Sequence, residues 1–225
     1  METIVLGIVQ NIKDLDTQML LGINQMHSAY WDSFMWLVTD KYVWIPLYLS
    51  LIYVIFRNHS PKAFLWCAVA IGLMILITDN FNSQWLRPWI GRLRPSNLDN
   101  PISSMVHVVN DYRGGPYGFP SSHSSNTWGI VFFVAFLFRK YWLNSFLAAW
   151  AILVCYSRSY LGVHYPGDLF VGMLLGLIGA ILAYLLFAYV TGEKPKKEIK
   201  HGYLPVIVVS VTFAGIIITS FFYHF

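Results

Sequence analysis

The stretch LFVGMLLGLIGAILAYLLFAYVTG, residues 169–192, contains no Asp, Glu, Lys or Arg. A helix that crosses about 30 Å of hydrocarbon needs about 20 residues, so this stretch is long enough to span a bilayer. Of the 225 residues, 56% are hydrophobic and only 12% are charged, which excludes a soluble globular protein. Similar runs recur along the chain and predict six spans, at 42–57, 62–80, 123–139, 142–158, 167–190 and 203–223.

Residues 1–41 have a different pattern, because charged side chains alternate there with apolar ones at helical spacing. This pattern favours amphipathic helices that lie in the membrane interface. The first span is short and must borrow from its flanks or tilt. We therefore predict a single all-α membrane domain, a polytopic bundle of about six transmembrane helices. Its parts are interfacial helices over 1–41, a catalytic bundle over 42–190, a basic cytoplasmic loop over 191–202 and an extra C-terminal span over 203–223.

The basic residues near the span ends predict the orientation. Alternate loops share one face of the membrane, and one face receives a compact set of lysines and arginines at 57–62, 139–140 and 194–200. The positive-inside rule places that face in the cytoplasm. We therefore expect a multi-pass protein of the cytoplasmic membrane whose polar motifs face the periplasm or exterior.

The two cysteines and a pair of glycines are sequence features that helix packing explains. Cys67 and Cys155 each fall within an apolar span, which predicts small buried side chains and neither a disulfide nor a metal pair. Gly172-x3-Gly176 forms a small-residue face that lets helices approach closely in lipid. We expect this face to pack inside the bundle, with a dimer contact as the alternative.

Three polar segments interrupt the apolar sequence, each at the end of a long apolar run. Arginine, histidine and aspartate are costly there unless they converge on something charged. Because the predicted topology brings all three to one face, they predict a single site. The segments are Arg87-x6-Arg94-Pro95, Pro120-Ser121-Ser122-His123 and Ser157-Arg158-x5-His164-x3-Asp168.

The first segment concentrates positive charge at the headgroup level, with Arg92 between its two motif arginines. Guanidinium groups stay ionised and offer paired donors that fit phosphate oxygens. The alternative is a basic span flank that touches lipid headgroups without specificity. Pro88 and Gly91 argue against one continuous helix through Arg87 and Arg94.

The second segment has the pattern of a helix start. A serine caps the helix, and the unpaired backbone N–H groups of the first turn, with the helix dipole, favour an anion such as phosphate. Ser122 and His123 stand at that position and can add a donor and a proton. The alternative is a capped helix with an ordinary interfacial histidine.

The third segment pairs His164 with Asp168 four residues later, and Pro166 suits the first turn of the helix between them. A carboxylate there can accept a proton from one imidazole nitrogen, which leaves the lone pair of the other nitrogen pointing outward. Such an imidazole can act as a nucleophile toward phosphorus. A metal site is the alternative, but two ligands are too few and His123 would have to be the third.

Together the segments resemble the signature of the type-2 phosphatidic acid phosphatase superfamily. That signature is a basic residue, six spacers and Arg-Pro, then Pro-Ser-x-His, then Ser-Arg, five spacers, His, three spacers and Asp. Residues 87–168 match it at every spacing. The chain departs from the family at Arg87, where lysine is usual, in having two spans before the first segment where many relatives have three, and in its extra last span.

The resemblance implies roles for these residues. Arg87, Arg94, Arg158 and Ser122 would bind the phosphoryl oxygens. His164 would be the nucleophile and Asp168 its orienting partner. His123 would protonate the leaving oxygen and then activate water, with no metal and no other cofactor.

The resemblance also implies an integral-membrane lipid phosphatase. Its substrate would be a phosphate or diphosphate on a lipid headgroup, with undecaprenyl diphosphate or a lipid A phosphate as the leading candidates. A lipid-to-lipid phosphotransferase is the main alternative, and a phosphate or lipid transporter is a weaker one because its site belongs near mid-membrane. The other expected partners are membrane lipids. No nucleic acid is expected, and the sequence makes no prediction about oligomeric state.

Overall fold

The computed structural model describes residues 2–223, with side chains from residue 4 onward. The regular structure in this range is helical, apart from two isolated β-bridges. A π-helical segment, Phe81–Leu86, joins α4 to α5, and a short 3-10 helix lies at Ser103–Met105. The α-helices are α1 Glu2–Asn24, α2 Ala29–Thr39, α3 Ile45–Asn58, α4 Pro61–Asn80, α5 Arg87–Ile90, α6 Ser122–Leu137, α7 Tyr141–Tyr160, α8 Pro166–Thr191 and α9 Leu204–Phe222.

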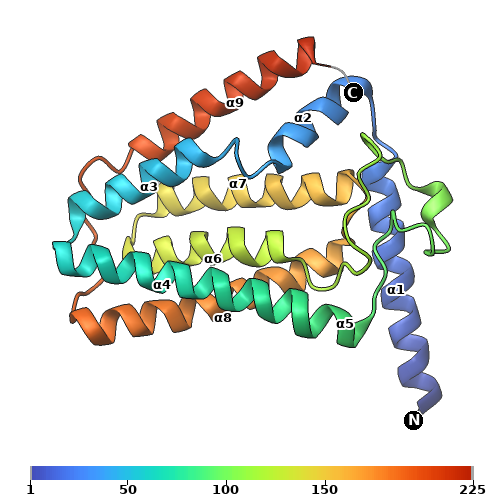
Figure 1. Ribbon diagram of the computed structural model, residues 1–225, viewed down its shortest axis with the longest axis horizontal. Helices are drawn as coiled ribbons and strands as arrows, with labels where there is room; N and C mark the ends of the chain where they lie inside the picture. Colours follow the sequence, from blue (N-terminus) through green and yellow to red (C-terminus); the bar gives the residue numbers. More distant parts are fainter. Residues whose placement is uncertain (1, 224–225) are drawn as a thin grey trace.

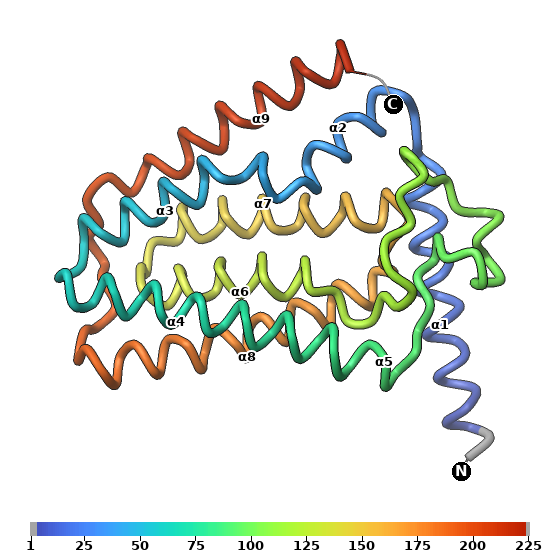
Figure 2. Tube along the Cα trace, viewed as in Figure 1, coloured from blue at the N-terminus to red at the C-terminus, as the bar shows by residue number. Residues whose placement is uncertain are grey.

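The long helices form one bundle, and α1 is oriented across it. Helices α3, α4, α6, α7, α8 and α9 run along the length of the molecule, whereas α1 crosses one end (Figure 1). The loop between α5 and α6 covers the same end (Figure 2). The prediction of an all-α membrane bundle is confirmed, and the six long helices begin and end within a few residues of the predicted spans, except that the second continues as far as Ile90.

Three helical stretches of the described chain are long and apolar enough by themselves to cross a membrane: Pro61–Ile90, Pro166–Thr191 and Leu204–Phe222. The first is longer than predicted because the π-helical segment carries the helix on through Pro88 to Gly91, where a φ of 64° ends it. Helix α3 is apolar but shorter. Helix α6 has 16 residues and opens with the polar run Ser-His-Ser-Ser-Asn-Thr, so its apolar part is short.

Helix α2, which lies in the region 1–41 predicted to form interfacial helices, packs one face against the bundle. It packs against α7 and α9, and its buried residues include Phe34 and Met35. A short turn joins it to α3, and across that turn the indole Nε1 of Trp44 donates to the Val38 carbonyl oxygen at 2.8 Å. Helices α2 and α3 follow each other along the bundle and lie between α7 and α9 (Figure 1).

The bundle core is built from large side chains. Trp44 is almost fully buried, and its ring meets that of Trp150 edge to face at 5.5 Å, an arrangement that aromatic pairs favour. Cys67 and Cys155 are both buried and both free. The prediction that they act as small buried side chains is confirmed.

The glycine pair of α8 faces α6 within the same chain. A Cβ on Gly172 would lie 2.5 Å from the Ser121 carbonyl oxygen, and one on Gly176 would lie 2.5 Å from that of Ser125. Contacts this short leave no room for a side chain, so the two helices touch backbone to backbone. The predicted packing inside the bundle is confirmed, and it brings the starts of α6 and α8 together.

Substituting one of these glycines tests this contact. Gly176→Ala should lower the free energy of unfolding by about 1–3 kcal/mol, because the added methyl overpacks the α6–α8 contact. Gly72→Ala in α4 is the matched control, because a Cβ added there would have no neighbouring side chain or backbone atom within 4 Å and alanine favours a helix over glycine. Unfolding of both variants in detergent measures the difference, and equal stability would contradict the contact.

Helix α1 is attached to the bundle end through a buried asparagine. The Asn24 side-chain amide donates to the carbonyl oxygens of His107 and Tyr160 at 2.9 and 2.7 Å. Its oxygen accepts from the His107 backbone N–H at 2.8 Å. Because these groups belong to the α5–α6 loop and the end of α7, α1 is fixed across the end of the bundle that carries the polar segments.

Candidate active site

The third polar segment connects α7 to α8. His164 lies in the connection and is fully buried, and Asp168 lies in the first turn of α8. The His164 Nδ1 atom is 3.5 Å from Asp168 Oδ2, which also accepts from the Tyr165 backbone N–H at 3.0 Å. The histidine and carboxylate face each other as predicted, through an electrostatic contact that is not aligned as a hydrogen bond.

The other nitrogen of His164 contacts Arg94. Arg94 Nη1 is 2.9 Å from His164 Nε2 and also donates to the Val163 carbonyl oxygen at 2.9 Å. Because arginine can only donate, Nε2 must accept and carry the lone pair, and the proton of the neutral ring is then on Nδ1, toward Asp168. This is the tautomer that the nucleophile hypothesis requires.

The electrostatic surroundings keep this imidazole neutral. Burial, followed by the nearby charges of Arg94 and Arg158, holds the pKa of His164 well below its usual value. Burial also lowers the pKa of Arg94, to about 10, which leaves the guanidinium charged at neutral pH. A neutral imidazole beside cations suits attack on an anionic phosphate.

The second polar segment starts α6 as predicted. Ser121 is the N-cap, and its hydroxyl accepts from the Ser124 N–H. Arg87 reaches this helix start from the end of the α4–α5 helix: its Nη2 donates to the Ser122 hydroxyl at 2.9 Å and its Nε to the Pro120 carbonyl oxygen at 3.1 Å. The first and second segments are therefore joined directly.

Arg158 is held by two residues that the sequence did not single out. Its Nη1 donates to the Thr39 hydroxyl at 2.7 Å and its Nη2 to the Tyr112 hydroxyl at 3.4 Å. Thr39 ends α2, and Tyr112 lies in the α5–α6 loop. Two separate parts of the chain thus hold the guanidinium of Arg158, a residue that is 2% exposed.

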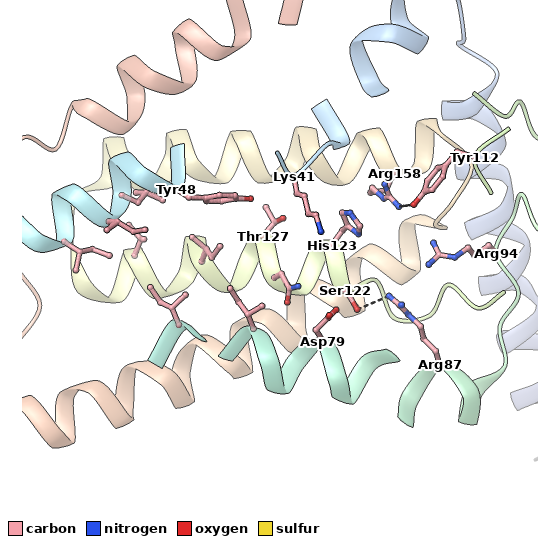
Figure 3. A pocket seen from close by; sticks show the side chains of 18 residues that line it. Lys41, Tyr48, Asp79, Arg87, Arg94, Tyr112, Ser122, His123, Thr127 and Arg158 are labelled. Atoms are coloured by element: carbon pink, nitrogen blue, oxygen red, sulfur yellow. Dashed lines mark hydrogen bonds between the residues drawn. The ribbon is translucent and has the colours of Figure 1, made fainter. Parts of the chain in front are cut away.

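One cavity of about 540 Å³ collects these groups. Figure 3 shows Arg87, Arg94, Arg158, Ser122 and His123 around its polar end. Lys41, Asp79, Tyr112 and Asn126 also line it. The remainder of the wall is largely apolar, formed by side chains of α3, α4 and α6, including Leu51, Ile52, Ile55, Ile71, Ile75, Ile130 and Val134.

His164 and Asp168 are not among the residues lining the cavity; Arg94, which bonds to His164 Nε2, is. The structure therefore brings all seven predicted residues into one cluster but places the histidine behind an arginine. The buried Nε atoms of Arg94 and Arg158 have no hydrogen-bond partner within the described chain. Buried donors without partners are rare in folded proteins, and a small movement of either side chain toward an anion bound in the cavity would give them a partner.

Sequence reasoning did not assign Arg92, Asp16, Thr39 or Tyr112 to the site. Arg92 Nη1 donates to Asp168 Oδ1 at 2.8 Å, and its Nη2 donates to Asp16 Oδ2 at 2.7 Å. The only signal in the sequence was the density of arginines around 87–94. Nothing in the pattern of 1–41 distinguishes Asp16 from a solvent-exposed helix residue.

The donors around His164 fit a metal ion poorly. Its Nε2 already faces the Arg94 guanidinium, and Asp168 Oδ1 faces that of Arg92, so cations occupy the positions where a metal would bind. A second group, His27, Asp32 and His107, lies in the described chain with its candidate ligand atoms within 4.8 Å of one another. The two imidazoles stack at 3.8 Å and 9°, so their lone pairs lie in parallel planes and do not converge on one ion.

The bundle of membrane helices gathers three arginines, a serine and two histidines at one end, an arrangement that defines an integral-membrane protein with a phosphate-binding site. The chain belongs to the PAP2 superfamily, whose model matches residues 63–192. The resemblance predicted from the sequence is thereby confirmed, and the protein is a lipid phosphate phosphatase.

Individual relatives agree with this assignment. The chain is 42% identical over 220 residues to a lipid A 4'-phosphatase of Bacteroides thetaiotaomicron, covering 94% of this chain and 98% of that protein. It is 30% identical over 181 residues to a lipid A 4'-phosphatase of Porphyromonas gingivalis, covering 80% and 76% of the two chains. The crystal structure of Aquifex aeolicus LpxE has the same fold, with a TM-score of 0.57 at 24% identity, over 75% of this chain and 94% of that one.

Proposed function

We propose that this enzyme removes the 4'-phosphate from lipid A at the outer face of the cytoplasmic membrane, by way of a phosphohistidine on His164. The observation that carries the proposal is the convergence of three arginines with Ser122 and His123 on one end of a single cavity. Guanidinium groups positioned in this way stabilise the charge that develops on a transferring phosphoryl group. The similarity to two lipid A 4'-phosphatases supports the choice of lipid.

The first chemical step transfers the phosphoryl group to the enzyme. His164 Nε2 attacks phosphorus, the bond between phosphorus and the lipid oxygen breaks, and His123, which takes up a proton when the anionic substrate binds beside it, gives that proton to the lipid oxygen. For this attack, Arg94 Nη1 must leave the nitrogen that it contacts at 2.9 Å and bind a phosphoryl oxygen instead. Binding of the substrate phosphate thus frees the Nε2 atom of His164 for the attack. Asp168 stabilises the positive charge that the imidazole gains.

The second step returns the enzyme to its starting state. His123, now neutral, takes a proton from water as the water attacks the phosphohistidine, and the bond between phosphorus and Nε2 breaks. Inorganic phosphate leaves, and both histidines regain their initial protonation. If a lipid hydroxyl replaces water, the same residues perform phosphotransfer.

The shape of the cavity supports a lipid substrate. Its polar end holds the arginines and its remaining wall is largely aliphatic, so a charged headgroup and part of a hydrocarbon chain can occupy it together. Lys41 lines the same cavity and adds positive charge near His123 (Figure 3). A free phosphate ester would leave the aliphatic wall unused.

The orientation is also part of the proposal. The loops at the end of the bundle away from α1 carry the lysine-rich segments, including 194–200 between α8 and α9. The positive-inside rule favours a cytoplasmic location for that end, so the polar end of the cavity would lie on the periplasmic side. A lipid that has been flipped to the outer leaflet can reach it there.

A panel of lipids tests the proposed function. The purified enzyme should release phosphate from lipid A but not from lipid A that lacks the 4'-phosphate, and it should keep its activity in excess chelator. Undecaprenyl diphosphate and phosphatidylglycerol phosphate complete the panel. Faster release from either would assign another lipid, label recovered in lipid would indicate phosphotransfer, and activity lost to chelator but restored by metal would revive the metal alternative.

A further inference from the structure

Helix α1 reaches the catalytic pair through a chain of charged groups. Arg92 stands between two carboxylates, with Nη1 2.8 Å from Asp168 Oδ1 and Nη2 2.7 Å from Asp16 Oδ2. The Asp168 side chain is fully buried, whereas those of Asp16 and Arg92 are 10% and 24% exposed. We propose that Asp16 and Arg92 are positioning residues that orient Asp168 toward His164, which makes α1 a working part of the active site.

The two oxygens of Asp168 have separate partners. Oδ1 accepts from Arg92, and Oδ2 accepts from the Tyr165 N–H and faces His164 Nδ1 at 3.5 Å. The bond from Arg92 to Oδ1 and the bond from the Tyr165 N–H to Oδ2 therefore fix the plane of the carboxylate together, and Arg92 is the side chain that contributes to it. Without the bond from Arg92 the carboxylate can rotate, and the Nδ1–H of His164 loses a fixed acceptor.

Arg92 is itself held rigidly. Its guanidinium carbon lies 3.8 Å from the centre of the Tyr165 ring, a cation–π distance, and Asp16 holds its other end. Tyr165 is the residue whose N–H binds Asp168 Oδ2. Ring, guanidinium and carboxylate therefore form one packed unit next to His164.

Asp16 also binds the start of α8 directly. Its Oδ1 accepts from the Gly167 N–H at 2.7 Å, so a residue of α1 satisfies one of the unpaired donors of the first turn of α8. A Cβ at position 167 would lie 2.7 Å from Asp16 Oδ2, so glycine there allows the carboxylate to approach. Asp16 thus reaches the segment that carries Asp168 in two ways, directly through Oδ1 and by way of Arg92 through Oδ2.

The charges of the two carboxylates explain why Arg92 is needed between them. Asp168 is a buried carboxylate and Asp16 is a second one nearby, so Arg92 neutralises a repulsive pair that burial would otherwise magnify. Asp16 lies outside residues 63–192, which the superfamily model matches. A segment beyond the shared core therefore acts on the central catalytic pair.

The inference rests on the proposed function, and its experiment uses the full-length enzyme with lipid A. Asp16→Asn should lower kcat about tenfold and Arg92→Gln about 100-fold, each with KM and the inhibition constant of inorganic phosphate within about twofold of the wild type. The double variant should be no slower than Arg92→Gln alone, because both act through Asp168. Arg92→Lys should recover part of the loss.

Asp14→Asn is the matched control, because Asp14 lies on the same helix and accepts from Gln10 on the exposed surface. It should keep wild-type kcat. Wild-type kcat in Asp16→Asn, a rise in KM without a fall in kcat, or independent and multiplicative losses in the double variant would overturn the inference.

A measurement without turnover separates this inference from the proposed function. In enzyme labelled with ¹⁵N-histidine, the His164 signal, assigned by its disappearance in His164→Gln, should show the Nδ1–H tautomer in the wild type and in both variants, because Arg94 still donates to Nε2, but the Nδ1 resonance should shift in Asp16→Asn and Arg92→Gln as the contact with Asp168 changes. Identical spectra would refute the positioning role. If the spectra change while no lipid releases phosphate, the proposed function fails and the positioning role stands.

Discussion

His164→Ala should lower kcat for lipid phosphate release by on the order of 10⁴-fold or more, because it removes the atom that forms the covalent intermediate. The residual rate would come from the arginines and Ser122, which bind the phosphate without the nucleophile. Steady-state phosphate release measures the effect. Brief reaction with ³²P-labelled lipid followed by alkaline quenching, which preserves phosphohistidine, should label the wild type and not the variant.

Two further variants keep this result interpretable. Because the His164 side chain is fully buried, His164→Gln preserves more of its volume and should be equally inactive with a melting temperature near the wild type. His201→Ala is the control histidine: it is exposed, contacts Tyr53 and lies in the loop between α8 and α9, at the end of the bundle away from α1. Full activity in a folded His164→Gln enzyme would exclude the covalent route.

Much of the site could be predicted because its parts are local in sequence. His164 and Asp168 are four residues apart at the start of α8, and this spacing makes them face each other. A serine before an apolar run marks the start of α6. The apolar runs located the bundle helices, because the need to bury backbone groups in lipid makes hydropathy a direct signal of helices. The convergence of the three segments followed from their positions at one face.

What the sequence did not reveal are contacts between distant segments. Arg158 is held by Thr39 and Tyr112, and Asp168 by an ion pair that leads to Asp16. No sequence period or spacing relates these residues, because each of these contacts depends on how the helices cross at the end of the bundle. Helix α2 shows the same point, because its charged residue suggested an interface while its apolar face packs into the bundle.

The contact between Arg94 and His164 is a second feature that the sequence did not reveal. Spacing placed Arg94 in the site but gave no indication that its Nη1 would contact the nucleophilic nitrogen. Gly114, at a φ of 69°, lets the loop pass this side chain, since a Cβ added there would lie only 3.1 Å from Arg94 Nε. The ability of Arg94 to bind either the imidazole or a phosphate depends on the folded loop, and the spacing of the motif does not predict it.

Arg158→Gln should lower kcat/KM by about 10²–10³-fold, the usual cost of removing one preorganised donor to transition-state charge. Arg158 is suited to this test because it lines the cavity, is 2% exposed and has a buried Nε with no partner in the described protein. The inhibition constant of inorganic phosphate should rise as well, since phosphate also loses this donor.

Arg158→Lys separates charge from geometry. A lysine keeps the positive charge but offers one ammonium in place of a planar fork, so it cannot hold Thr39, Tyr112 and a phosphoryl oxygen together, and its loss should be smaller than that of glutamine but clear. Arg57→Gln, an exposed arginine in the last turn of α3, is the control and should change neither kcat/KM nor phosphate inhibition. If lysine restored full activity, charge alone would suffice at this position. If glutamine lowered kcat/KM without weakening phosphate inhibition, Arg158 would act through the fold of the α2–α7 contact and not on the phosphate.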